Sequence, residues 1–135
     1  MLMEAKKDLE TRVFEVKLKG NKLELPPELE DKYKLLYLYN VLHKTKYGEY
    51  FCIFAASDEF IETLVYNDSK KNLKELLEKN RGLYLPKEAQ VKNGTICLPE
   101  NLMKKAQIKN NSKCVLIIKN YGLQIHESNY YYATH

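Results

Sequence analysis

Long hydrophobic runs are missing from this chain of 135 residues. A helix that crosses a bilayer needs about 20 consecutive apolar residues, and no segment approaches that length. The first residues, from Met1 to Asp8, become charged too soon for a secretory signal. From these absences we predict a cytoplasmic protein that neither spans nor binds a membrane.

Cysteine is scarce, with only three residues, Cys52, Cys97 and Cys114. They form an odd set without CxxC spacing, which favours reduced thiols. Each lies in an apolar run that is typical of a strand. We therefore expect three reduced thiols in the core.

Arginine is almost absent, since Arg12 and Arg81 are the only two among 22 basic residues. A hydrophobic fraction of 44% and a mean hydropathy of −0.52 are typical of a soluble globular protein. The net charge of +4 is compatible with a polyanionic partner. It is equally compatible with an AT-rich genome, which favours Lys, Asn, Ile and Tyr.

No catalytic motif stands out, because the sequence lacks a phosphate loop, a serine elbow and a paired set of carboxylates. The histidines are scattered along the sequence at His43, His126 and His135, and His43 lies in a polar segment. No two of them have the spacing of metal ligands. We therefore expect neither an enzyme nor a metal site, and no cofactor or small-molecule substrate.

A segment that occurs twice is the strongest positive feature. Residues 16–29 and 91–102 both contain a polar turn, a short alternating strand that ends in Leu-Pro, and the start of a helix. A repeat at about half the chain length indicates two copies of one small unit. In the first turn, Gly20 and Asn21 can both take a positive φ, which is typical of a β-hairpin.

The spacing of apolar residues and the positions of proline and glycine predict the remaining helices and strands. A proline in the first helical turn loses no hydrogen bond, so Pro27 and Pro99 can each begin a short helix. The clearest helix is expected at 69–80, where Leu73, Leu76 and Leu77 form an apolar stripe. Strands are predicted at 13–18, 23–25, 35–39, 50–54, 89–91, 114–118 and 123–126, and further helices at 27–33 and 58–64.

This pattern divides the chain into two similar units. The expected parts are a lead-in at 1–12, a first unit at 13–66, a connecting helix and linker at 67–87, a second unit at 88–128 and a C-terminal tail at 129–135.

The order of strand, turn, strand, Leu-Pro, short helix and hairpin resembles the AbrB-like swapped-hairpin fold, and two copies at this length resemble the MraZ family of bacterial transcriptional regulators. In that family each turn reads Asp-x-x-Gly-Arg, and three further residues separate the arginine from a Pro. Counting back from Pro26 places Lys22 at the arginine, and counting back from Pro99 places Thr95 there. The signature arginines are therefore replaced in this chain.

Residues outside the turns extend the resemblance to most of 13–128. Residues 48–54 are similar to the Gly-Cys-Leu-x-Leu segment of the family, and His126 stands where its closing hairpin has tryptophan. The resemblance implies an α+β fold in which two pseudo-repeated swapped-hairpin units form one small β-barrel-like core with short helices. It also implies a nucleoid-associated homo-oligomer that binds double-stranded DNA and regulates transcription.

The chemistry of the two turns fits such a role. Lysines can neutralise phosphates, but lysine reads guanine less well than the planar fork of arginine. The expected DNA-binding residues are Lys17, Lys19, Asn21, Lys22, Lys92, Asn93 and Thr95. The alternative is a solvated hairpin whose lysines protect strand edges, in a diverged scaffold or protein-interaction module that does not bind DNA.

Four tyrosines lie in or next to the predicted strands at 35–39 and 50–54, which form the middle hairpin: Tyr37, Tyr39, Tyr47 and Tyr50. Exposed tyrosine rings can stack on the bases of single-stranded nucleic acid. Their alternation along strands favours core or subunit contacts instead. The Tyr130 to Tyr132 run is expected to dock on the domain or on a neighbouring subunit.

Overall fold

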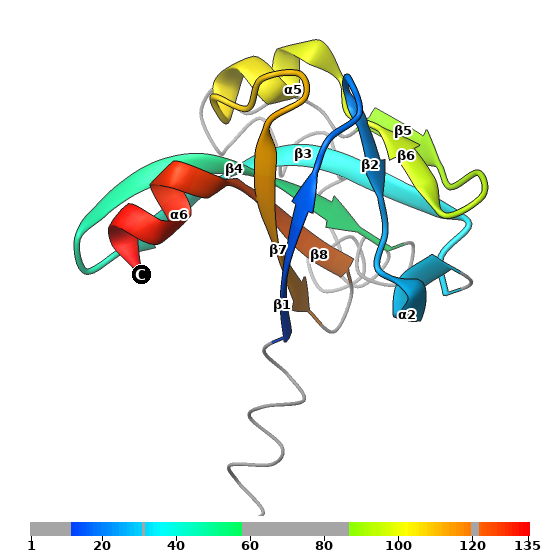
Figure 1. Cartoon of the computed structure of the whole chain (residues 1–135), viewed down its shortest axis with the longest axis horizontal. Coiled ribbons are helices and arrows are strands. Elements are labelled where there is room, and N and C mark those ends of the chain that lie inside the picture. Colours follow the sequence, from blue (N-terminus) through cyan, green and yellow to red (C-terminus); the bar gives the residue numbers. More distant parts are fainter. Residues whose placement is uncertain (1–11, 31, 58–86, 120–121) are drawn as a thin grey trace, which may run out of the picture.

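The computed structural model describes residues 12–30, 32–57, 87–119 and 122–135. These residues form a mixed α+β fold of antiparallel strands with short helices (Figure 1). The strands are β1 (Arg12–Lys17), β2 (Lys22–Glu24), β3 (Leu35–Thr45), β4 (Gly48–Ala56), β5 (Lys87–Gln90), β6 (Thr95–Cys97), β7 (Lys113–Lys119) and β8 (Gly122–Glu127). The helices are α2 (Pro27–Glu30), α5 (Glu100–Lys105) and α6 (Ser128–Thr134).

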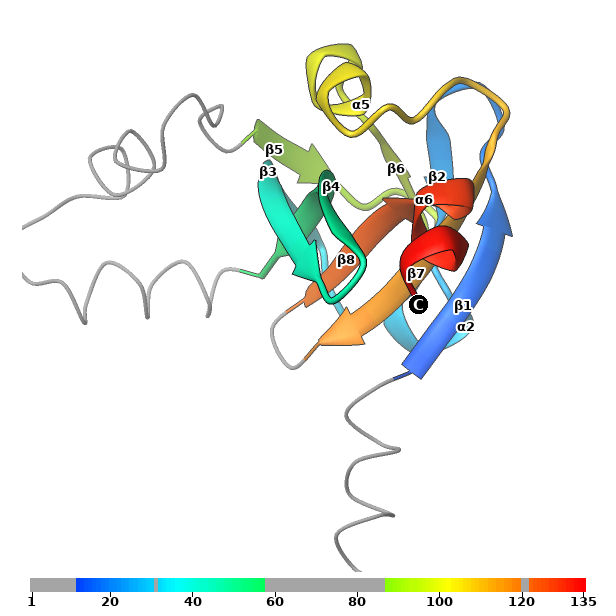
Figure 2. The same cartoon turned by 90° about the vertical axis from the view of Figure 1, so that its left-hand side faces the viewer.

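Six strands form one sheet in the order β1-β7-β8-β4-β3-β5, and β2 pairs with β6 in a separate two-stranded ribbon. The two halves of the chain interleave, because β1 pairs with β7, β5 pairs with β3, and β4 pairs with β8. Figure 2 shows the sheet curling into half of a barrel, with the ribbon and α5 beside its open side. The fold is thus one body, to which both halves contribute strands.

The main core of the described residues fills the space between the ribbon and the curled sheet. Leu23 of β2 and Ile96 of β6 face each other in register and are almost fully buried. They pack in the same cluster as Leu38, Ile53 and Leu116 from the sheet. Since side chains alternate along a strand, this burial directs the other ribbon residues outward.

Gly122 marks the closest approach of two strands in this core. Its φ is +152°, and a Cβ at this position would lie 1.9 Å from the carbonyl oxygen of Ala55 in β4. Glycine is the residue that allows β8 to pair with β4 at this point.

The observed elements agree with the predicted alternation, but the bounds of several elements differ. The segment around His43 was predicted to be a polar break, but it continues β3 to Thr45. The first Leu-Pro helix was expected over 27–33 and is helical at Pro27–Glu30. The expected tail contains a helix, α6, that packs on β7 and β8.

The helices predicted at 58–64 and 69–80 lie outside the described residues, as does the lead-in before Arg12. None of the helices in the described ranges has the length and apolar character that a membrane crossing requires.

Candidate nucleic-acid interface

Both turns of the repeated segment are two-residue hairpin loops. The backbone groups of Lys19 and Lys22 exchange two hydrogen bonds of 3.0 Å, and those of Lys92 and Thr95 do the same. In the second turn Asn93 and Gly94 have φ values of 53° and 71°, as a type I′ turn requires. In the first turn Gly20 has a φ of 63° but Asn21 does not have a positive φ, so the expectation for Asn21 was wrong.

Each turn also supports the other. The amide of Leu25 donates to the carbonyl oxygen of Gly94 at 2.8 Å, and the amide of Leu98 donates to that of Asn21 at 2.9 Å. Both donors are the leucines that precede proline in the repeated segment. These reciprocal bonds join the two turns and the ribbon into one continuous surface.

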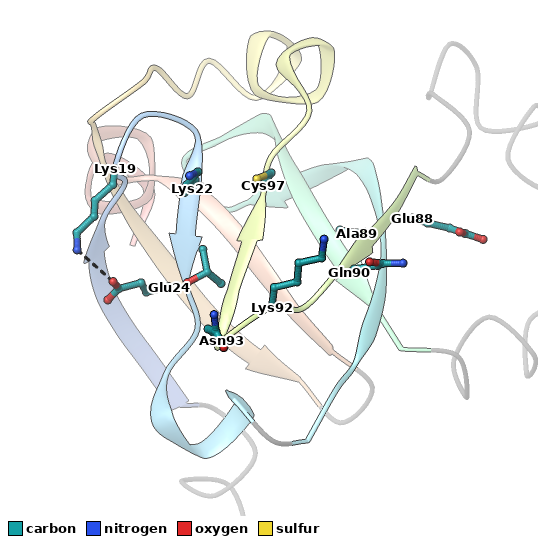
Figure 3. Close-up of a pocket in the computed structure, with 10 residues that line it drawn as sticks. Lys19, Lys22, Glu24, Glu88, Ala89, Gln90, Lys92, Asn93 and Cys97 are labelled. Carbon is teal, nitrogen blue, oxygen red and sulfur yellow. Dashed lines mark hydrogen bonds and ion pairs between the residues drawn. The ribbon is translucent and has the colours of Figure 1, made fainter.

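The outer face of the ribbon carries polar side chains because Leu23 and Ile96 occupy the inner face. A hollow of about 650 Å³ lies over this face (Figure 3). It is lined by Lys19, Lys22, Glu24, Glu88, Ala89, Gln90, Lys92, Asn93, Thr95 and Cys97. The structure therefore brings together five of the seven predicted DNA-binding residues, from both halves of the chain.

The remaining two predicted residues lie elsewhere. The side-chain amide of Asn21 donates to the carbonyl oxygen of Leu98 at 3.0 Å, so it holds the chain just before α5. Lys17 is exposed on β1, directly opposite Lys113 of β7. Sequence reasoning missed Lys113, which becomes a neighbour of Lys17 only when the two halves of the chain pair.

The electrostatics of the hollow are mixed. Lys22 and Lys92 are exposed there, whereas the Lys19 ammonium lies 3.2 Å from a carboxylate oxygen of Glu24. Glu88 adds a second carboxylate to the lining. An ion pair as exposed as Lys19–Glu24 is weak and leaves the lysine able to exchange partners. This surface can hold phosphates through point charges, but it offers no arginine fork among its lining residues.

Cys97 also faces this hollow, which corrects the expectation of three buried thiols. It is exposed on β6 and lies opposite Lys22 in the register. Cys52 and Cys114 are buried, and burial raises the pKa of each thiol to about 12. Sequence reasoning missed the difference because Cys97 occupies the outward position of a three-residue strand.

The histidines, which appeared scattered in the sequence, lie together at the other side of the molecule. The Nε2 atoms of His43 and His135 are 3.2 Å apart, and the rings of His43 and His126 meet edge to face at 4.6 Å. The fully buried His126 bonds through Nδ1 to the Tyr50 hydroxyl at 2.7 Å and through Nε2 to the Gln124 side-chain oxygen at 2.9 Å.

Burial is the main cause that lowers the pKa of His126 to about 3, with smaller contributions from His43 and His135. Burial likewise lowers the pKa of His43. His126 is therefore neutral near pH 7, and both of its ring nitrogens are engaged. This arrangement is suited to packing in the core.

Tyr39 and Tyr50 are buried, whereas Tyr47 is 71% exposed at the tip of the β3–β4 hairpin. The Tyr130 ring stacks on Tyr50 with a centroid distance of 5.5 Å, so the tyrosine run docks on the domain as expected. The tyrosines of the middle hairpin therefore do not form one exposed stacking platform.

The sequence matches no model of a known protein family, and the search of curated proteins likewise found no match.

Proposed function

We propose that this chain is a DNA-binding transcriptional regulator of the MraZ type, built from two AbrB-like swapped-hairpin units. The observation that carries the proposal is the convergence of Lys22 and Lys92, from the two repeated turns, on one outward surface. Strands from both halves build the ribbon under this surface, so the two turns present their lysines as a unit. A duplex would meet both turns at once.

The strand pairing supports the swapped-hairpin part of the proposal. In a swapped arrangement, the first strand of each unit pairs with the hairpin of the other unit. Here β1 pairs with β7, and its counterpart β5 pairs with β3. Leu23 and Ile96, which stand at equivalent positions before the two Leu-Pro pairs, face each other across the ribbon.

The proposed mode of binding is phosphate contact with little reading of base sequence. Lysine contributes a flexible point charge, and each phosphate neutralised on B-DNA steepens the fall of log affinity with log salt by about 0.9. Thr95 can add a single hydrogen bond. In this proposal the protein works in the cytoplasm, associated with the nucleoid, without a cofactor and without catalysis.

A mobility-shift titration with duplex DNA at several salt concentrations tests the proposal. Lys22→Ala and Lys92→Ala should each weaken binding and reduce the salt slope by about 0.9. Lys44→Ala is the matched control, because Lys44 is exposed on β3, outside the hollow. The absence of any retardation at low salt, or an equal effect of Lys44→Ala, would refute the proposed interface.

A second candidate function is a protein-interaction scaffold of the same fold. Glu24 and Glu88 favour it, because their carboxylates reduce the positive charge of the hollow. Self-association belongs to both candidates, and the edge strands β1 and β5 present backbone groups that a second copy can pair with. Light scattering that finds an oligomer, together with no DNA binding, would favour the scaffold.

A further inference from the structure

The β3–β4 hairpin reaches beyond the sheet and meets the C-terminal helix. Figure 1 shows the end of this hairpin beside α6 and the C-terminal residue. His43 belongs to the hairpin and His135 directly follows α6. Both histidines lie away from the ribbon that carries the proposed DNA-binding surface, so they form a separate feature of the fold.

The two imidazoles approach each other through nitrogen atoms that can act as ligands. Their Nε2 atoms are 3.2 Å apart. Two nitrogen ligands at 2.0–2.1 Å from a tetrahedral zinc ion lie about 3.3 Å from each other. The observed separation therefore already matches the spacing of two ligands on one metal ion.

The surroundings of His135 hold its ring in the tautomer that metal binding needs. Its Nδ1 lies 2.9 Å from the carbonyl oxygen of Tyr131, and because a carbonyl only accepts, Nδ1 must donate. The lone pair of the neutral ring is then on Nε2, which faces His43. Histidines that bind metals are commonly oriented by such a bond from the other ring nitrogen.

Packing holds both rings in place. The ring of Tyr131 stacks on His135 with a centroid distance of 4.2 Å, and the ring of His126 meets His43 edge to face. His126 is itself engaged at both nitrogens, so it supports His43 and is not available as a third ligand.

We propose that His43 and His135 form a two-histidine site for a borderline divalent transition-metal ion such as Zn²⁺ or Ni²⁺. Within the described ranges no three His, Cys, Asp or Glu side chains are placed to hold a metal together, so water completes the coordination. When the metal binds, His43 carries its proton on Nδ1 and gives its Nε2 lone pair to the ion. The bound ion joins the β3–β4 hairpin to α6.

Isothermal titration calorimetry tests this proposal on full-length protein carrying Cys97→Ser, which removes the exposed thiol as a competing ligand. In this titration Zn²⁺ and Ni²⁺ should each bind with one-to-one stoichiometry. In a thermal denaturation experiment each ion should raise the melting temperature of the protein. His43→Gln and His135→Gln should each weaken binding by at least about tenfold. Lys46→Gln, an exposed change on the same hairpin, should leave it unchanged.

Nitrogen-15 spectra of the imidazoles provide a second, direct readout. Zinc should shift the Nε2 resonances of His43 and His135. The nitrogen resonances of His126 should not shift, because both of its ring nitrogens remain hydrogen-bonded. If His43→Gln impairs folding, the His135→Gln variant provides the test by itself, because His135 is exposed. Unchanged binding in the histidine variants, or no binding by the parent up to about 1 mM metal, would overturn the proposal.

Discussion

At the scale of single residues, two glycines with nearly the same φ have different roles. Gly122 has a φ of +152° and Gly48 a φ of +149°, values that side chains rarely adopt. A Cβ on Gly122 would collide with the Ala55 carbonyl, whereas a Cβ on Gly48 would meet nothing within 4 Å. The two sites therefore share the backbone strain and differ in the steric contact.

We expect Gly122→Ala to lower the free energy of unfolding by about 3 kcal/mol or more, because β8 must move away from β4. Gly48→Ala is the matched control and should cost about 1 kcal/mol, from strain alone. Urea denaturation of both variants measures the difference. Equal losses in the two proteins would mean that the close approach at Gly122 is not a constraint.

The thiols also differ residue by residue. Cys97 is exposed on the ribbon, while burial keeps Cys52 and Cys114 protonated and inaccessible. We expect a thiol reagent such as DTNB to modify one cysteine of the native protein rapidly and all three after unfolding. The Cys97→Ser variant should lose the rapid phase, and a rapid phase that persists in it would contradict the assigned burial.

The burial of Cys52 and Cys114 should also make the free energy of unfolding fall at alkaline pH. The ordinary pKa of a cysteine thiol is 9.0, and burial raises the pKa of Cys52 and Cys114 to about 12. Below pH 9 both thiols are protonated in the folded and the unfolded chain, so their contribution is fully present. As pH rises toward 12, the unfolded chain loses protons that the folded chain keeps, and folding becomes less favourable.

Each buried thiol should reduce the free energy of unfolding by about 2 kcal/mol between pH 9 and about 10.5. Chemical denaturation across this range measures the slope. Cys114→Val keeps the site apolar and removes one titrating group, so its slope should be smaller than that of the parent. A variant with an unchanged slope would exclude Cys114 as a source of the effect.

At the scale of elements, the two turns show how different residues can build equivalent loops. One turn uses a positive φ at Gly20 alone, and the other uses Asn93 and Gly94 together. Their side chains also have different tasks, since Asn21 holds the chain before α5 while Lys22 points into the hollow. Two adjacent residues, the last of the loop and the first of β2, thus have different roles: one supports the fold and the other lines the hollow.

Substitutions of Asn21 and Lys22 should have opposite effects on stability and on the salt slope of DNA binding. Asn21→Ala loses the bond to Leu98 and should lower the free energy of unfolding by about 1 kcal/mol, with the salt slope of DNA binding unchanged. Lys22→Ala should reduce that slope and change stability by less than about 0.5 kcal/mol. Thermal denaturation and the mobility-shift titration, run on both variants, distinguish the roles. A lower salt slope for Asn21→Ala would instead place its side chain in the interface.

At the scale of the whole molecule, the interleaved strands make the two halves depend on each other. The first strand β1 is held by β7, near the other end of the chain, and the ribbon joins β2 to β6. The buried pair Leu23 and Ile96 lies where the two halves meet over the sheet. Disruption of either half therefore removes pairing partners from the other.

Unfolding of the described core should be a single cooperative event. Leu23→Ala should destabilise the protein by about 3 kcal/mol and accelerate amide exchange in β1, β7 and β3 to a similar extent. Hydrogen exchange followed by NMR measures each strand separately. The exposed substitution Lys44→Ala is the control, and exchange that accelerates in one half only would contradict an interleaved fold.

Much of this architecture was predictable from local patterns. Alternation located the strands, and the repeated Leu-Pro segments located the turns and the starts of α2 and α5, because backbone preferences act over a few residues. The sequence also indicated Lys22 and Lys92 as candidate DNA-binding residues, since they flank the two repeated turns. It did not indicate Lys113 or Cys97, whose surroundings depend on pairing partners from distant strands.

The sequence by itself determined where this chain turns, alternates and breaks, since steric limits on φ and the hydrophobic period operate between near neighbours. Only the tertiary structure decided which strands pair across the halves, which thiol is exposed and that His43 and His135 meet. These outcomes depend on contacts between residues far apart in the chain, and the burial of one shared core selects among them.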